Sequence, residues 1–170
     1  MPDDMSHSVT VTRTTTTTTT SAILLNTGYF KTYPGLLKLF ELLIGAAIVG
    51  ITAHYGSNYY HNYVTQSPEI FLCIVATTFM VGTACLLLSC ILSISTASIL
   101  PKTLFEVIFH SVATILYLAA SINFLVEVNQ MKKNYGYKYE PYLAAAILGL
   151  INTVLYLLST FLAYRSYKGK

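Results

Sequence analysis

Residues 70–94 read IFLCIVATTFMVGTACLLLSCILSI, and none of these 25 side chains is charged. About 20 helical residues cross the roughly 30 Å hydrocarbon core of a bilayer, so this stretch is long enough to span a membrane. Three further apolar runs of similar length lie at Leu36–Ala53, Leu104–Val126 and Tyr142–Tyr164. Together the four runs take up 89 of the 170 residues. The sequence therefore predicts an all-α integral membrane protein, a bundle of four transmembrane helices.

The amino-acid composition agrees with a membrane protein. Hydrophobic residues make up 54% of the chain and charged residues only 10%, against about 45–50% and about 25% in an average soluble domain. The formal net charge is only +3, which is not the strongly basic balance of a nucleic-acid binder. We therefore expect no nucleic-acid partner.

The three cysteines, Cys73, Cys85 and Cys90, all lie inside one apolar run. No pair of loops can then be joined by a disulfide, and packing within the lipid must hold the fold. Cys90 lies near the predicted cytoplasmic face and is a candidate for S-acylation. The alternative, which we favour, is that Cys90 is a small packing residue.

Four segments are expected along the chain. Residues 1–21 form a disordered, Thr-rich cytoplasmic tail, and residues 22–35 form a segment at the membrane interface. Residues 36–164 form the transmembrane domain, and residues 165–170 form a short basic cytoplasmic tail. The seven threonines from Thr14 to Thr20 are either phosphorylated or a neutral spacer, and we favour the spacer.

Lys and Arg residues predict the orientation. Seven of them fall on the side that holds both termini, namely Arg13, Lys31, Lys38, Lys102, Arg165, Lys168 and Lys170. The other side holds three, Lys132, Lys133 and Lys138. Because basic residues favour the cytoplasmic side, both termini are expected in the cytoplasm, with the protein in the plasma membrane, in vesicles or in both.

Small and polar residues recur at helical spacing in every predicted span. The stripe is Glu41, Gly45 and Thr52 in the first span, Thr78, Gly82, Cys85, Ser89 and Ser93 in the second, Glu106, His110, Ala113, Tyr117 and Ser121 in the third, and Ala145, Gly149, Asn152, Tyr156 and Ser159 in the fourth. Helices in lipid associate through close backbone approach and interhelical hydrogen bonds, and such stripes supply both. The predicted helix-packing residues are Gly45, Ala46, Gly50, Gly82, Ala145 and Gly149.

Charged residues inside the spans form a candidate polar cluster: Lys38, Glu41, Lys102, Glu106 and His110. An unpaired charge at the centre of a bilayer is costly, so these residues are expected to have partners. Lys38 could pair with Glu41 three residues later, and Glu106 could reach Lys102 or His110. We favour a structural role for the cluster over a functional one.

The sequence offers no pattern for catalysis, and we predict no enzyme activity, cofactor or metal. Glu106 and His110 could supply at most two metal ligands, whereas a catalytic metal site normally uses three and an open position. Neither a His-Glu-x-x-His pattern nor a Gly-rich phosphate loop occurs.

The chain resembles a MARVEL domain. The resemblance rests on four spans with short loops and on residues before and within the first span: Asn26, Tyr29, Gly35, Leu36, Lys38 and Glu41. It covers Asn26 to Lys170 and is greatest to the chemokine-like factor MARVEL transmembrane group. Claudins would need a Trp and paired Cys in a long first loop, and tetraspanins a large Cys-rich second loop; the sequence has neither.

The resemblance implies a role in membrane microdomains, vesicle trafficking and membrane apposition or fusion. The Thr-rich head before this core is similar to an insect member of the family implicated in myoblast fusion. Implied partners are membrane lipids, cholesterol-rich or anionic, other membrane proteins, and further copies of the chain. The alternative function is a small channel or proton-coupled carrier that uses Glu41, Glu106 and His110.

Overall fold

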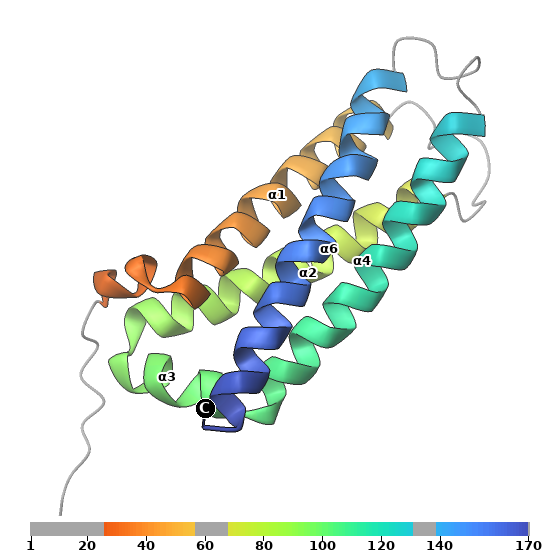
Figure 1. The fold of residues 1–170 in the computed structure, drawn as a ribbon. Coiled ribbons are helices and arrows are strands. Elements are labelled where there is room, and N and C mark those ends of the chain that lie inside the picture. The colour runs from red at the N-terminus through yellow and green to blue at the C-terminus, as the bar shows by residue number, and fades with distance from the viewer. Residues whose placement is uncertain (1–25, 57–67, 131–138, 170) are drawn as a thin grey trace, which may run out of the picture.

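The computed structural model describes residues 26–56, 68–130 and 139–169. Four long helices run antiparallel to one another through this part of the chain (Figure 1): α1 Tyr33–Gly56, α2 Pro68–Leu92, α4 Leu104–Gln130 and α6 Tyr139–Tyr167. Each is long and apolar enough to cross a membrane. The predicted all-α bundle of four transmembrane helices is confirmed. The Thr-rich tail, residues 1–21, lies outside the described residues.

The helices are arranged as a ring. α1 packs against α2 and α6, and α4 packs against the same two helices, so α1 and α4 lie diagonally across the bundle. Every span is longer at one or both ends than the sequence predicted; α1, for example, begins at Tyr33 rather than at Leu36. Prolines sit in the first turns of α1, α2 and α6, where the missing N–H costs no helical hydrogen bond.

The second span ends earlier than predicted. α2 stops at Leu92, and Ser93 adopts an extended backbone whose side-chain oxygen accepts a hydrogen bond from the Thr96 amide at 3.2 Å. Ser93 thus caps a separate short helix, α3 Ile94–Ile99, which continues into the 3-10 turn η2 Leu100–Lys102. Figure 1 shows α3 at the same end of the bundle as the C-terminus.

A 3-10 turn, η1 Thr27–Lys31, leads into α1. The Asn26 amide donates to the Ile91 carbonyl at 2.7 Å, which fixes this turn against the end of α2. Gly35 is required here, because a Cβ at this position would lie 2.1 Å from the Tyr29 carbonyl oxygen. Tyr29, in the segment expected at the membrane interface, is buried and packs with Leu87 and Cys90.

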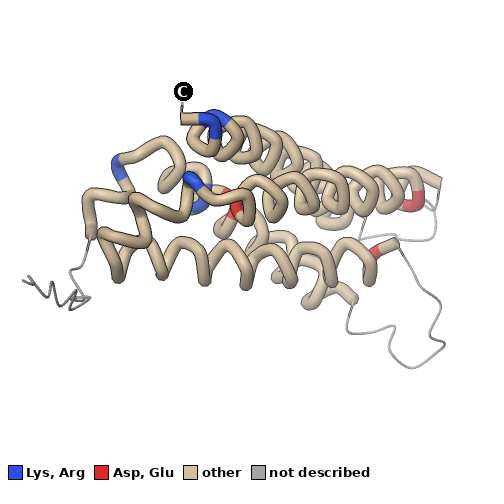
Figure 2. The backbone as a smooth tube through the Cα atoms, turned by 90° about the horizontal axis from the view of Figure 1, so that it is seen from below, with Lys and Arg blue, Asp and Glu red and all other residues tan. Residues whose placement is uncertain are grey.

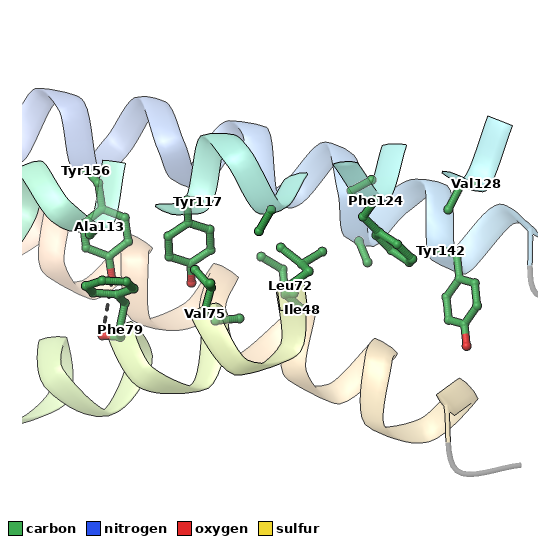
Figure 3. Packing of buried hydrophobic residues seen from close by; sticks show 14 residues of the cluster. Ile48, Leu72, Val75, Phe79, Ala113, Tyr117, Phe124, Val128, Tyr142 and Tyr156 are labelled. Carbon is green, nitrogen blue, oxygen red and sulfur yellow. Dashed lines mark hydrogen bonds between the residues drawn. The ribbon is translucent and has the colours of Figure 1, made fainter. Parts of the chain in front are cut away.

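The core runs the length of the bundle (Figure 3). Tyr156 and Tyr117 lie towards one end of the cluster, Ile48 and Leu72 follow, and Phe124 and Tyr142 lie towards the other end. Large apolar side chains also cover the outside of the bundle, and Ile115, for example, is 66% exposed. Such an outer surface suits lipid and not water.

The structure places three of the predicted packing residues in helix contacts within the bundle. Gly45, Ala145 and Gly149 are buried. A Cβ on Gly149 would lie 2.2 Å from Ser121 Oγ, so the glycine lets α6 approach Ser121 of α4 this closely. Gly82 is partly buried and lies against the Phe109 ring.

The prediction was wrong for Ala46 and Gly50, which are both exposed. The buried face of α1 contains Glu41, Gly45, Ile48 and Thr52, among others. Ala46 follows Gly45 by one residue, which is a rotation of about 100° away from that face. A Cβ on Gly50 would meet no atom within 4 Å.

The polar stripe of α2 was also predicted on the wrong face. Thr78, Cys85 and Ser89 are exposed, whereas the buried face is mostly apolar, with Leu72, Val75, Ala76, Phe79, Thr83, Leu86, Leu87 and Cys90. The Thr78 hydroxyl donates to the Ile74 carbonyl and the Ser89 hydroxyl to the Cys85 carbonyl, each at 2.8 Å. Because these hydroxyls are satisfied within their own helix, they can face lipid without a partner on another helix.

Candidate functional site

An ion pair crosses the interior of the bundle between α1 and α4. The Lys38 ammonium donates to the Glu106 carboxylate, and each residue is only 2% exposed. The pairing of Lys38 with Glu41, considered from their spacing, is replaced by this longer-range contact. Lys102 lies exposed in η2, and no ion pair joins it to Glu106 in the described part of the chain.

Glu41 is fully buried and contacts two other helices. Ser159 of α6 donates its hydroxyl to Glu41 Oε1 at 2.5 Å. His110 of α4 places Nε2 3.9 Å from Glu41 Oε2, while its Nδ1 lies 2.7 Å from the Glu106 backbone carbonyl. We call Lys38, Glu41, Glu106, His110 and Ser159 the buried network.

The structure thus brings together four of the five residues of the candidate polar cluster and leaves Lys102 outside. Ser159 was in the predicted stripe of α6 but not in the cluster. The available signal was its spacing, three residues after Tyr156 and seven after Asn152, which puts all three on one face of α6. Spacing within α6 does not show which side chain of α1 Ser159 contacts.

Further polar side chains continue the buried network along the bundle. Asn152 Nδ2 lies 3.5 Å from the Glu41 backbone carbonyl. The Tyr156 and Thr83 hydroxyls are 2.8 Å apart, and the Tyr156 ring stacks on the Tyr117 ring with centroids 5.3 Å apart. Thr83, which was not predicted, lies one position after Gly82 of the predicted stripe and is buried, whereas Gly82 is only partly buried.

A small pocket opens beside the ion pair. It is lined by residues from α1, η2, α4 and α6: Pro34, Lys38, Pro101, Glu106, Ser159, Leu162, Ala163 and Ser166. Its volume of about 10 Å³ is the space of about one water molecule. Three members of the buried network therefore lie within reach of water at this end.

The ends of the bundle differ in charge (Figure 2). Lys31 precedes α1, Lys102 precedes α4, and Arg165 and Lys168 lie at the end of α6, which places these basic residues at the same end as the pocket. Among the residues that the structure describes, the acidic side chains outside the buried network lie at the opposite end: Glu69 and Glu140 in the first turns of α2 and α6, and Glu127 in the last turn of α4.

Cys90 lies in a small apolar cluster, away from the lipid. It is fully buried beside Tyr29, and burial raises the pKa of the Tyr29 hydroxyl, which keeps that hydroxyl neutral. This burial does not favour S-acylation of Cys90 and agrees with a packing role. Within residues 26–56, 68–130 and 139–169, no group of three or more His, Cys, Asp and Glu is placed to hold a metal ion.

Comparison with known families identifies this bundle. The family model described as the MARVEL membrane-associating domain matches residues 29–162. The chain belongs to the MARVEL family. The match begins at Tyr29 and ends at Leu162, so the MARVEL domain includes every residue of the buried network.

Two curated MARVEL relatives are similar to this chain over most of its length. Plasmolipin of Danio rerio is 28% identical over 149 residues, which cover 84% of this chain and 77% of plasmolipin. Protein singles bar of Drosophila melanogaster is 28% identical over 151 residues, which cover 85% of each chain. No solved structure matches the chain. The narrower resemblance to the chemokine-like factor group stays a prediction.

Proposed function

We propose that this MARVEL protein is a non-enzymatic membrane organiser that acts in vesicle trafficking, membrane apposition or fusion. Its contacts would be lateral, with lipids and with other membrane proteins. The observation that carries this proposal is the apolar outer surface of all four helices, which offers binding area mainly within the bilayer. The family resemblance implies a role in myoblast fusion, and the chain is similar to singles bar over most of both chains, so myoblast fusion is the specific process to test.

We further propose that both termini lie in the cytoplasm. An even number of spans supports this, because it would keep the start of α1 and the end of α6 on one side of the membrane. The basic residues Lys31, Lys102, Arg165 and Lys168 gather at that end, and basic residues favour the cytoplasmic side. At such a surface each basic side chain is attracted to anionic lipid by about 1 kcal/mol.

The second candidate function is a proton-coupled carrier, which the burial of Glu41, Glu106 and His110 would favour. Transport requires a polar path across the whole bundle. Past Tyr117, however, most of the described core is apolar, with Ile48, Leu72 and Phe124 among its side chains. Of the buried polar side chains there, Thr52 donates to carbonyls of its own helix, and Ser121 Oγ has no hydrogen-bond partner among the described residues. This layer favours the organiser over the carrier.

Proximity labelling tests the organiser. The full chain carries a labelling enzyme at its C-terminus in cells that express it naturally, and a second four-span protein of the same membrane carries the same enzyme as the control. We expect selective labelling of fusion, coat or junction proteins. Labelling that matches the control would contradict the proposal. A pH-dependent current in liposomes that hold only this chain, lost in Glu41→Gln, would instead support the carrier.

A further inference from the structure

Two buried acceptor atoms face one another inside the bundle. Glu41 Oε2 on α1 and His110 Nε2 on α4 are 3.9 Å apart, and both residues are 0% exposed. Neither atom has a hydrogen-bond partner among the described residues. A buried polar group without a partner costs about 1–3 kcal/mol, so this arrangement needs a physical explanation.

The protonation of His110 follows from its other nitrogen. Nδ1 lies 2.7 Å from the Glu106 backbone carbonyl, which can only accept a hydrogen bond, so Nδ1 carries the hydrogen. A neutral imidazole then leaves Nε2 as an acceptor that points at Glu41. Because Glu41 Oε1 already accepts from Ser159, a single proton on Oε2 would turn two opposed acceptors into a donor and an acceptor.

Charge balance points the same way. Lys38 and Glu106 cancel one another as an ion pair. The charges of Glu41 and His110 sum to zero only when the pair holds one proton in addition to the hydrogen on His110 Nδ1, whichever of the two residues carries it. The other titratable groups near Glu41 and His110 are the neutral side chains Tyr29 of η1, Cys90 of α2, Tyr117 of α4 and Tyr156 of α6. A network without net charge avoids the cost of burying an unpaired charge in lipid.

Ser159 connects this pair to water. Its hydroxyl donates to Glu41 Oε1, and the residue is one of those that line the pocket, which has space for about one water molecule. In the other direction, the core around Ile48, Leu72 and Phe124 is mostly apolar. We therefore take the pocket at the Lys/Arg-rich end as the route to water.

We propose that the bundle binds one proton between Glu41 Oε2 and His110 Nε2, and that this proton exchanges through Ser159 with water in the pocket. As a proton enters, a hydronium ion in the pocket donates a proton to Ser159 Oγ while the Ser159 hydroxyl proton passes to the Glu41 carboxylate, and a neutral water molecule is left behind. Rotation of the carboxyl group then turns its O–H towards His110. A shift of about 1 Å brings the two atoms within hydrogen-bond distance.

Infrared spectroscopy of the full chain in lipid nanodiscs tests this site. We expect a protonated-carboxyl band at neutral pH that is absent in Glu41→Gln. On transfer to D₂O the band shifts as deuterium replaces the carboxyl proton. The rate of this exchange should be lower in Ser159→Ala than in the unmodified chain, by about tenfold or more. Ser159→Thr keeps a hydroxyl and should restore the rate.

Ser111→Ala is the matched control, because the Ser111 hydroxyl donates only to the Val107 carbonyl of its own helix. In Ser111→Ala the carboxyl proton should exchange for deuterium at the same rate as in the unmodified chain. A second variant, Ser166→Leu, fills the pocket without touching Glu41 and should also slow exchange, which keeps the test available if Ser159→Ala does not fold. A band that persists in Glu41→Gln overturns the proton site, and unmodified rates in both Ser159→Ala and Ser166→Leu overturn the route. Neither result bears on the organiser role, which rests on the outer surface.

Discussion

The Lys38 ammonium on α1 and the Glu106 carboxylate on α4 form an ion pair across the diagonal of the bundle. Glu41 and His110 face one another across the same diagonal, again from α1 and α4. These two helices share little other contact, because each packs mainly on α2 and α6. The buried network therefore links the two halves of the ring and sets the height at which α1 and α4 face one another.

Removing one partner of the ion pair should be more harmful than removing both. Glu106→Leu leaves a buried ammonium without its counter-charge, at an expected cost of about 3–5 kcal/mol. Glu106→Gln keeps an acceptor for Lys38 and should cost less. The double variant Lys38→Met with Glu106→Leu should recover most of the loss, since no charge remains. Thermal unfolding in detergent micelles measures all three.

Lys102→Met serves as the control for that series, because Lys102 is exposed and lies outside the buried network. It should unfold at the temperature of the unmodified chain. Equal stability of Glu106→Leu and Lys102→Met would show that the ion pair contributes nothing to the fold.

The glycines of α1 and α6 should respond in opposite ways to an added methyl group. Gly149→Ala places a Cβ 2.2 Å from Ser121 Oγ and should destabilise the bundle by about 1–3 kcal/mol. Gly50→Ala meets no neighbour within 4 Å and should be neutral or slightly stabilising, because alanine is the better helix former. Adding Ser121→Ala to Gly149→Ala should restore part of the stability. Unfolding temperatures that rank the two single variants the other way would contradict this packing.

Apolar run length was enough to predict the four spans, because no shorter helix crosses the hydrocarbon core. It could not predict which face of a span is buried. Lipid is as apolar as the core, so Thr78 and Ser89 can face outward once they bond their own helix, and Ala46 and Gly50 carry no signal that separates them from Gly45. The break at Ser93 was equally hidden, since the apolar run continues through it.

The candidate site was predictable in its depth but not in its pairs. The spacing of Lys38, Glu41, Glu106 and His110 placed all four at one height in the membrane. Whether Lys38 meets Glu41 or Glu106 depends on the rotation of two helices about their axes, and a sequence pattern within either helix does not contain that rotation. The role of Ser159 depends on a third helix, α6, and was missed for the same reason.

The orientation can be tested with tags on living cells. Tags at either terminus should be reached by antibody only after permeabilisation, whereas a tag near Ser57, which follows α1, should be reached on intact cells. Each tag is also read after permeabilisation, to show that it is present. Staining of a terminal tag on intact cells would place the Lys/Arg-rich end outside the cell.

The proton site predicts how stability depends on pH. In the unfolded chain an exposed carboxyl has lost its proton well below neutral pH, and an exposed imidazole has lost its extra proton by about pH 7. Above about pH 7 the unfolded chain therefore binds fewer protons than a folded chain that keeps one between Glu41 and His110. The stability of the unmodified chain should fall as pH rises from about pH 7 to about pH 9, by up to about 1.4 kcal/mol per pH unit while the folded chain still holds the proton. Glu41→Gln needs no proton to stay neutral, so its unfolding temperature should change less over the same range. Denaturation of both chains in the same detergent, at several pH values, measures the difference in slope. A carboxylate that stays ionised in the fold would give the opposite result, with the unmodified chain no more sensitive to rising pH than Glu41→Gln.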